Sequence, residues 1–392
     1  MLIIVAPGQG AQTPGFLEPW LEDPAFADRL GWLSAVAGID LAYYGTKADA
    51  DTIRDTAIAQ PLLVGAGLVA ALALFPHPAD AFNLIGAVAG HSVGELTAAA
   101  GARAISAEQA MVLVRERGKA MAQAAATTPT GMTAVLGGDK EEVLAKLSHH
   151  GLTPANINGP GQIVAAGTID QLAALAADPP TKARLMPLQV AGAFHTEHMA
   201  PAVSVMGQLA MGVSTHDPRT PIISNKDGQV VHDGRAVLQR IVNQIARPVR
   251  WDLCLQTMTD LGVTGLLEMP PAGTLAGIAK RALPGVETFA LKTPDQLDDA
   301  RAFCQKHGTP SSIDVSPTWR LLVSPTKGTF LRDEIGDTLE PRAQVGRVKS
   351  LREETPVVAP HGGTVVEWLV EDGDLVSPGQ PLLRLYPEET QA

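Results

Sequence analysis

The stretch NLIGAVAGHSVGEL (residues 83–96) contains the feature that decides the fold. Its first half, through Ala89, is an apolar run of strand length, and the Ala-rich residues from Glu95 onward favour a helix. Between them lies G-H-S-V-G, a GxSxG at a strand-to-helix turn, which is the setting of a nucleophile elbow. Ser92 would stand at a helix N-terminus, where developing negative charge is favoured. The competing interpretation is a tight turn whose serine merely caps the helix.

The composition is that of a globular protein with a substantial core. The chain has 392 residues, enough for two or three domains, and it is 45% hydrophobic and 18% charged. A net charge of −11 without a long basic run argues against nucleic-acid binding. The apolar run from Pro61 to Phe75 is too short for a membrane span, so it predicts a buried helix and no membrane partner. Cys254 and Cys304 predict free thiols and a cytoplasmic location.

Strands and helices alternate over most of the chain, which predicts an α/β fold with a parallel sheet. Residues 2–6 predict a first strand, followed by the glycine loop at 7–12. That loop has neither a Walker nor a GxGxxG spacing, which argues against nucleotide binding there. It is either an ordinary turn or a support that aims the amide or the N–H of Gln9 at a site. One helix is expected to begin near Gln60 and Pro61, and another is expected to cover residues 107–125.

Residues 131–190 form a separate pattern of strands and helices, which predicts the element order βαββαβ of a ferredoxin-like unit. The unit would be inserted into a core formed by residues 1–130 and 191–307. The expected elements are strands at 132–136, 155–158, 162–166 and 183–190, and helices at 139–149 and 169–177.

The last part of the chain changes character. Residues 308–318 are expected to be a linker, and residues 319–388 a small all-β barrel-sandwich domain. Within it, SPTKGTF (324–330) matches APHGGTV (359–365) as a weak internal repeat. The tail is therefore predicted to contain two similar β halves.

Six motifs together resemble the malonyl-CoA:acyl carrier protein transacylase family, most closely its actinobacterial members. They match in order and spacing and cover about residues 1–290. The motifs are PGQGAQ (7–12), AQPLL (59–63), GHSVGE (90–95), RERGKAM (115–121), NINGPGQIVAAG (156–167) and AFHTEHM (193–199). The resemblance implies an α/β-hydrolase-like acyltransferase core.

The resemblance assigns the catalytic roles. Ser92 would be the nucleophile and His195 its general base, oriented by a backbone carbonyl at the position of Arg250. Gln9 and the backbone N–H of Val93 would form the oxyanion hole. The chemistry suits these roles, because serine needs an adjacent base and histidine can take and return one proton near neutrality.

The resemblance also assigns the substrate contacts. Arg117 would bind the free carboxylate of the malonyl group, because a guanidinium pairs with a carboxylate through two hydrogen bonds. Phe194 would disfavour a methyl branch, and Gln60 and Asn156 match motif positions near the pocket. On its own, each of these side chains is as well explained as part of the core or the surface.

Two departures from the family pattern concern loops. Arg247 stands where an Asn is usual before Pro-Val, and Met269-Pro270-Pro271-Ala272-Gly273 replaces a usual G-P-G. The tail resembles a biotinyl/lipoyl carrier domain, but the place of its modified lysine holds Arg352, which cannot be acylated. An unmodified domain with a structural or docking role is expected.

The function implied is transfer of a malonyl group from malonyl-CoA to the phosphopantetheine thiol of acyl carrier protein, without a cofactor or metal. A malonyl-serine intermediate would link the two half-reactions, and fatty-acid synthesis is the default pathway. Polyketide synthesis and a malonate decarboxylase system stay open. A serine hydrolase or thioesterase shares the elbow, and a scaffold with a vestigial catalytic domain is a further alternative. Lys280 and Arg281 are candidates for a carrier-facing basic patch, or plain surface residues.

Overall fold

The computed structural model describes residues 1–190, 192–309, 320–350, 353–360 and 362–387. The chain divides into two compact units, Met1–Ile313 and Asp314–Ala392. The first unit contains both the α/β core and the inserted sheet, and the second is all-β. The predicted linker lies largely outside the described residues, because residues 310–319 are not among them.

The core of the first unit is a six-stranded sheet in the order β10-β9-β1-β2-β7-β8. All neighbouring strands run parallel except β7 and β8, which form an antiparallel edge. The strands are β1 (Leu2–Ala6), β2 (Ile85–Gly90), β7 (Ile222–Ile223), β8 (Val230–Val231), β9 (Gly265–Glu268) and β10 (Glu287–Ala290). The expectation of an α/β fold with a parallel sheet is confirmed.

The sheet is buried on both faces, as the alternating side chains of β1 show. Leu2 and Ile4 face the larger hydrophobic cluster, which packs against α1, α3, α5, α6, α9, α10 and α13. Ile3 and Val5 face the smaller cluster, formed with α11 and α12. Successive side chains of a strand point to opposite faces, so an entirely apolar strand belongs in the middle of such a three-layer arrangement.

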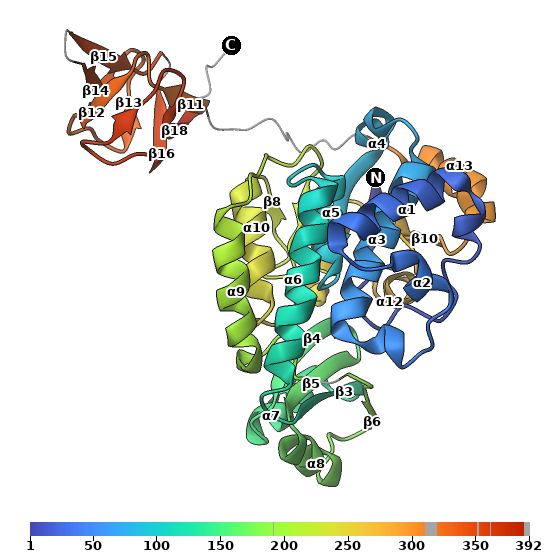
Figure 1. Cartoon of the computed structure of the whole chain (residues 1–392). Coiled ribbons are helices and arrows are strands. Elements are labelled where there is room, and N and C mark those ends of the chain that lie inside the picture. The colour runs from blue at the N-terminus through green and yellow to red at the C-terminus, as the bar shows by residue number, and fades with distance from the viewer. Residues whose placement is uncertain (191, 310–319, 351–352, 361, 388–392) are drawn as a thin grey trace. The chain divides into compact units, whose positions relative to one another are not determined.

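Figure 1 shows the long α6 lying between α3 and the pair α9 and α10. The helices before the insertion are α1 (Pro24–Ala37), α2 (Leu41–Thr46), α3 (Thr56–Leu74), α4 (Pro78–Leu84), α5 (Gly94–Gly101) and α6 (Ala107–Ala125). Those after it are α9 (Ala200–Met211), α10 (Gly234–Gln244), α11 (Trp251–Asp260), α12 (Thr274–Ala282) and α13 (Leu297–His307). Single turns of 3-10 helix cover Trp20–Glu22, Thr52–Arg54, Glu197–Met199 and Pro294–Gln296.

Two predicted element starts in the core were wrong, and each has a local cause. α3 begins at Thr56 rather than near Gln60, because the Asp55 side chain accepts the Ala57 N–H and caps the helix earlier. Pro61 therefore lies inside α3. β2 begins at Ile85, since the residues just before it complete the last turn of α4.

By length and apolar composition alone, α3 could cross a membrane. However, 72% of that stretch is buried inside the protein. It packs within the larger hydrophobic cluster, as the core helix of a globular protein does.

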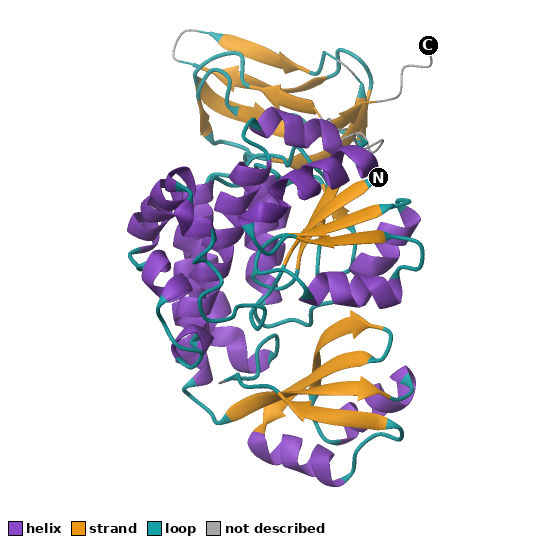
Figure 2. Ribbon diagram, turned by 90° about the vertical axis from the view of Figure 1, so that its right-hand side faces the viewer, coloured by secondary structure: helices purple, strands orange, loops and turns teal. Residues whose placement is uncertain are grey.

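The inserted part is an antiparallel four-stranded sheet in the order β4-β5-β3-β6. Its elements follow the predicted order βαββαβ: β3 (Thr130–Gly137), α7 (Lys140–His149), β4 (Thr153–Gly159), β5 (Gln162–Thr168), α8 (Ile169–Ala177) and β6 (Ala183–Pro187). Val143 of α7 and Leu175 of α8 join one hydrophobic cluster with the strands. Both helices thus cover the same face, as in a ferredoxin-like unit, and Figure 2 shows this sheet below the core sheet.

The second unit consists of two four-stranded sheets, β11-β18-β16-β13 and β15-β14-β12-β17. The strands are β11 (Arg320–Val323), β12 (Gly328–Arg332), β13 (Thr338–Leu339), β14 (Gln344–Lys349), β15 (Glu354–Val358), β16 (Gly363–Trp368), β17 (Leu375–Val376) and β18 (Pro381–Pro387). The repeated motifs lead into β12 and β16, which lie in different sheets. Each half also gives two outer strands to the other half's sheet, because β11 and β13 flank β18 and β16, and β15 and β17 flank β14 and β12.

Candidate active site

Ser92 occupies a sharp turn between β2 and α5. Its φ is 52°, a left-handed backbone conformation that costs free energy for a residue other than glycine. Two glycines make the turn possible. A Cβ on Gly90 would overlap the backbone of Gly94, and a Cβ on Gly94 would overlap the Ala6 carbonyl on β1. The GxSxG spacing therefore produces a nucleophile elbow in this chain.

The glycine loop after β1 runs beside this elbow. A Cβ on Gly8 would lie 2.9 Å from the His91 carbonyl oxygen. The Gln9 side chain points elsewhere, since its Nε2 donates to the Arg54 carbonyl at 3.1 Å and to Thr56 Oγ1 at 3.3 Å. Within the described parts of the chain, no acceptor is hydrogen-bonded to the backbone N–H of Gln9 or of Val93. These two N–H groups, and not the Gln9 amide, are free to bind an anion.

His195 meets Ser92 from a loop that follows the inserted sheet. Its Nε2 lies 2.8 Å from Ser92 Oγ, and its Nδ1 lies 2.7 Å from the Gln244 carbonyl oxygen. A carbonyl oxygen only accepts, so Nδ1 carries the proton and Nε2 is the acceptor for the serine hydroxyl. His195 also has a positive φ, 62°, and its backbone N–H donates to the Ile245 carbonyl at 3.1 Å.

The surroundings of His195 keep its imidazole neutral. The side chain is 3% exposed, and burial lowers its pKa to about 3, with the positive charge of Arg117 acting in the same direction. A neutral imidazole with a free lone pair on Nε2 is the form that can accept a proton from serine.

The orienting carbonyl is not that of Arg250, and that prediction was wrong. The Arg250 carbonyl accepts the N–H groups of Leu253 and Cys254, both at 3.2 Å, in the first turn of α11. Gln244 is the last residue of α10. Carbonyls in the last turn of a helix have no partner within the helix, and this one accepts from both His195 Nδ1 and the Arg247 N–H, the latter at 3.1 Å.

Arg117 reaches the same serine from the buried side of α6. It is 1% exposed, and its Nη2 lies 3.3 Å from Ser92 Oγ. Nη1 donates to Gln60 Oε1 at 2.7 Å, and Nη2 donates to Gln244 Oε1 at 3.0 Å. Nε is buried and has no hydrogen-bond partner in the described structure. Burial lowers the pKa of Arg117 to about 10, which leaves the guanidinium charged at neutral pH.

Three polar residues support the Arg117 guanidinium and the Ser92 turn, and the sequence analysis did not identify any of them: Gln244, Glu95 and Asn225. Gln244 Nε2 donates to Glu95 Oε2 at 2.6 Å and to Asn225 Oδ1 at 3.0 Å. Asn225 in turn fixes the elbow, because its Oδ1 accepts the Ser92 N–H at 2.8 Å and its Nδ2 donates to the Gly90 carbonyl at 2.7 Å. The only sequence signals were the place of Glu95 directly after the GxSxG and of Asn225 just past β7.

Glu95 is the buried acid of this network. Burial raises its pKa to about 8, while the hydrogen bond from the Asn225 N–H, 2.7 Å to Oε1, and the charge of Arg117 lower it. The network therefore places an acid close to the cationic Arg117 without a direct ion pair between them.

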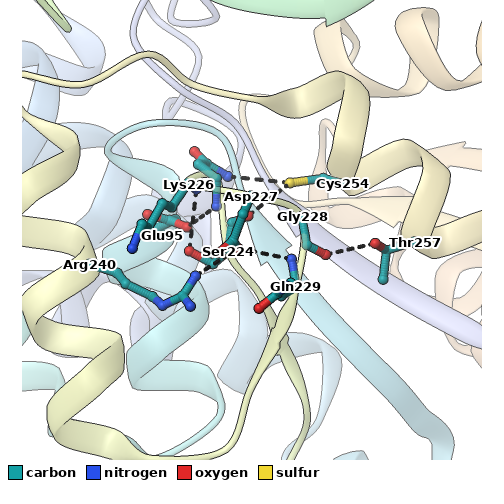
Figure 3. A network of polar contacts seen from close by, with 10 residues as sticks. Glu95, Ser224, Lys226, Asp227, Gly228, Gln229, Arg240, Cys254 and Thr257 are labelled. Atoms are coloured by element: carbon teal, nitrogen blue, oxygen red, sulfur yellow. Dashed lines mark hydrogen bonds and ion pairs between the residues drawn. The ribbon is translucent and has the colours of Figure 1, made fainter.

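The turn that carries Asn225 is itself held on several sides, as Figure 3 shows. Cys254 Sγ donates to the Ser224 carbonyl at 3.4 Å, and Thr257 Oγ1 donates to the Gly228 carbonyl at 2.7 Å. Asp227 forms an ion pair with Arg240 at 2.7 Å. Both cysteines of the chain are buried and free, so Cys254 serves here as a packed hydrogen-bonding group.

The remaining predicted residues differ in how close they come to Ser92. Gln60 lies in the buried site through its contact with Arg117. Phe194 is buried beside His195 in the larger hydrophobic cluster. Asn156 is on β4 and is bridged to Val249, and its described contacts do not include Ser92, His195 or Arg117.

A serine in a strained elbow, a neutral histidine at hydrogen-bond distance and a buried cation at the same oxygen define an enzyme of the serine acyl-transfer class. The Acyl transferase domain family matches residues 3–302. "Malonyl CoA-acyl carrier protein transacylase" of Mycobacterium tuberculosis is 50% identical over 299 residues, which cover 76% of this chain and 99% of the relative. The protein of the same name from Mycolicibacterium smegmatis is 50% identical over 286 residues, 72% of this chain and 98% of the relative. The chain belongs to the malonyl CoA-acyl carrier protein transacylase family.

Solved structures agree with this assignment. The crystal structure of MCAT from Mycobacterium tuberculosis aligns with a TM-score of 0.74 at 50% identity and covers 77% of this chain and 99% of that one. A type II PKS acyl-carrier protein in complex with its malonyl-transacylase includes a chain that aligns with a TM-score of 0.71 at 28% identity, covering 77% and 99%. The family match ends at residue 302, before the second unit begins.

Proposed function

We propose that this protein transfers the malonyl group of malonyl-CoA to the phosphopantetheine thiol of acyl carrier protein, in the cytoplasm and for fatty-acid synthesis. The observation that carries the proposal is the position of Arg117, whose buried guanidinium contacts Ser92 Oγ. An acyl group on that oxygen would place a terminal carboxylate beside the unpartnered Nε, and buried donors require a partner. The names of the relatives support the same substrate and carrier.

The first half-reaction loads the serine. Ser92 Oγ attacks the thioester carbonyl carbon while its proton passes to His195 Nε2, 2.8 Å away. The carbonyl oxygen becomes an anion and accepts hydrogen bonds from the backbone N–H groups of Gln9 and Val93. Losing one such donor typically costs about 10²–10³-fold in turnover. The intermediate collapses, the C–S bond breaks, and the imidazolium returns its proton to the departing CoA thiolate.

The second half-reaction repeats these steps with the carrier thiol. The thiol gives its proton to His195 Nε2 and attacks the malonyl-serine carbonyl, and Ser92 Oγ leaves with that proton. Throughout, Arg117 holds the malonyl carboxylate through charge-assisted hydrogen bonds worth about 1.5–3 kcal/mol. Gln60 fixes the guanidinium, and the ring of Phe194 limits space for a branched acyl group. We assign no contact in this cycle to Asn156.

Mass spectrometry of the intact protein after incubation with malonyl-CoA tests the proposal. The native protein should gain one malonyl group, and Ser92→Ala should gain none. Offered acetyl-CoA and malonyl-CoA together, Arg117→Ala should load acetyl in preference to malonyl, whereas Arg115→Ala, on the same helix but outside the site, should behave as native. A malonyl adduct on Ser92→Ala would refute the assignment of the nucleophile.

A hydrolase with the same elbow is disfavoured by the group behind His195. Serine hydrolases orient and stabilise their imidazolium with a carboxylate, and here a neutral carbonyl of Gln244 takes that place. Release of free malonate should therefore be slow without acyl carrier protein and transfer fast with it. Equal rates of malonate release with and without the carrier would favour the hydrolase.

For the second unit, residues 319–388, we propose a biotinyl/lipoyl-like domain that carries no prosthetic group and serves assembly or stability. Two similar halves that exchange strands support the likeness. Arg352, at the place of the modified lysine, lies outside the described residues. We further propose residues 1–130 and 191–307 as the catalytic core, 131–190 as an inserted subdomain and 308–318 as a linker. A chain truncated after residue 315 should transfer malonyl at the native rate, and a large loss would instead give the tail a catalytic role.

A further inference from the structure

A cavity of about 1060 Å³ opens in the first unit away from the catalytic residues. Ser92, His195 and Arg117 are not among its lining residues. The cavity lies along α3 and α5 on the side of the sheet that carries the larger hydrophobic cluster. The described catalytic chemistry makes no use of it.

The inner wall of the cavity is apolar. It is formed by side chains of α3, β2 and the residues between them, chiefly Leu68, Leu72, Phe75, Ile85 and Val88. Small residues of α5, such as Ala98 and Ala100, leave the space open. An apolar pocket of this size is in the range that takes small-molecule ligands, and burial of each CH2 there strengthens binding by up to about fourfold.

The rim of the cavity is cationic. Arg29 of α1, Arg103 after α5 and Arg219 before β7 converge on it from three separate segments, and all three are exposed. Asp217 apart, none of the carboxylates in the described parts of the chain forms an ion pair with them. The guanidinium of Arg219 lies 5.8 Å from the ring centroid of Phe82, at the junction of rim and wall. The lining carboxylate, Asp217, accepts the Gly234 N–H at 3.2 Å.

We propose that this cavity binds an amphipathic carboxylate, with the chemistry of a free fatty acid. The chain would lie along Leu68, Phe75 and Val88, and the carboxylate would meet the arginines of the rim, where a planar guanidinium gives a bidentate partner. The ligand and malonyl-CoA can then be bound at the same time, because no side chain of the proposed catalytic site lines the cavity where we place the ligand.

Tryptophan fluorescence gives a direct readout, because Trp32 lines the cavity and is 56% exposed. Titration of the full chain with dodecanoate should change the emission with a stoichiometry of one, and Trp32→Phe should abolish the change. Dodecanol should bind at least tenfold more weakly because it lacks the charge, and hexanoate at least tenfold more weakly because it buries fewer methylenes. Equal binding of dodecanol and dodecanoate would overturn the assignment of an anionic ligand.

Variants locate the site. Arg29→Ala/Arg103→Ala/Arg219→Ala should weaken dodecanoate at least tenfold, and Leu72→Glu should weaken it by placing a negative charge on the wall. Arg184→Ala, an exposed arginine of the inserted sheet, should bind as native does. Circular dichroism shows whether each variant is folded. Native affinity in both the triple variant and Leu72→Glu would refute this cavity.

Two further measurements distinguish the cavity from the catalytic site and from a membrane-binding surface. Saturating malonyl-CoA should leave dodecanoate affinity unchanged, and competition between them would place the fatty acid in the catalytic site instead. The protein should not sediment with phosphatidylglycerol vesicles, and sedimentation that the triple variant loses would make the rim a lipid-headgroup site. Malonyl loading of Ser92 is measured separately, so a failure of this inference leaves the proposed function standing.

Discussion

The elbow at Ser92 and the network around Gln244 position the proposed catalytic groups in two different ways. The elbow is local, since β2, the turn and α5 are continuous in sequence and two glycines make the turn sterically possible. The network joins Glu95, Arg117, Asn225 and Gln244, which come from four separate segments of the chain, through buried hydrogen bonds. The elbow fixes where Ser92, the proposed nucleophile, stands, and the network fixes what surrounds it. Damage to the two regions should therefore have different consequences.

The largest effect is expected from Gly94→Ala in the elbow. The new Cβ would overlap the Ala6 carbonyl, and neither β1 nor α5 can move without disturbing the centre of the sheet. We expect little folded protein and no measurable malonyl loading. Gly101→Ala is the matched control, because a Cβ there meets nothing within 4 Å. Native yield and activity for Gly94→Ala would show that the elbow tolerates more than its geometry indicates.

A smaller effect is expected from Gln244→Leu in the network. The backbone carbonyl that orients His195 remains, but the charged Arg117 loses a hydrogen bond worth about 1.5–3 kcal/mol, and Glu95 loses the hydrogen bond from Gln244 Nε2. We expect a folded protein whose kcat/KM for malonyl-CoA falls about 10²-fold, a loss of the order that one well-placed polar contact supplies. Asn243→Ala, at the exposed neighbouring position, should leave both stability and kcat/KM unchanged. A loss confined to stability, with native kinetics, would mean that Gln244 does not position Arg117.

The third prediction concerns pH and sharpens the proposed role of His195, with an effect that is small in any single pH unit. Its pKa is about 3 in the folded protein, against an unfolded value of 6.5. Below pH 6.5 the unfolded chain binds a proton that the folded chain does not, so stability falls as pH drops from 6.5 towards 3, by up to about 1.4 kcal/mol per pH unit. Urea unfolding of His195→Gln should show a shallower fall over this window than the native protein. Parallel curves would mean that the imidazole is not held neutral.

The same contrast explains what the sequence could predict. Ser92 and the helix at 107–125 follow from local patterns, because spacing, glycine content and helix periodicity act between near neighbours. The roles of His195 and Arg117 came from family resemblance, since no local signal separates them from the other histidines and arginines. Their convergence requires contacts across 103 residues for His195 and 25 residues for Arg117.

The misses have the same origin. Gln244 was overlooked, and Arg250 was named in its place, because which carbonyl faces an imidazole depends on where α10 ends and how the next loop packs. The orientation of the Gln9 side chain, away from Ser92, could not be predicted for a similar reason. Its hydrogen-bond partners lie on the 52–56 segment, and only the folded structure brings that segment beside Gln9. The cavity with its arginine rim had no sequence signal, because its lining comes from many segments.

The exchange of outer strands between the halves of the second unit affects how that unit can come apart. Neither half retains a complete sheet if the other unravels, because each supplies both outer strands of its neighbour's sheet. The unit should melt in one concerted transition, and fragments split near residue 350 should regain structure only when mixed.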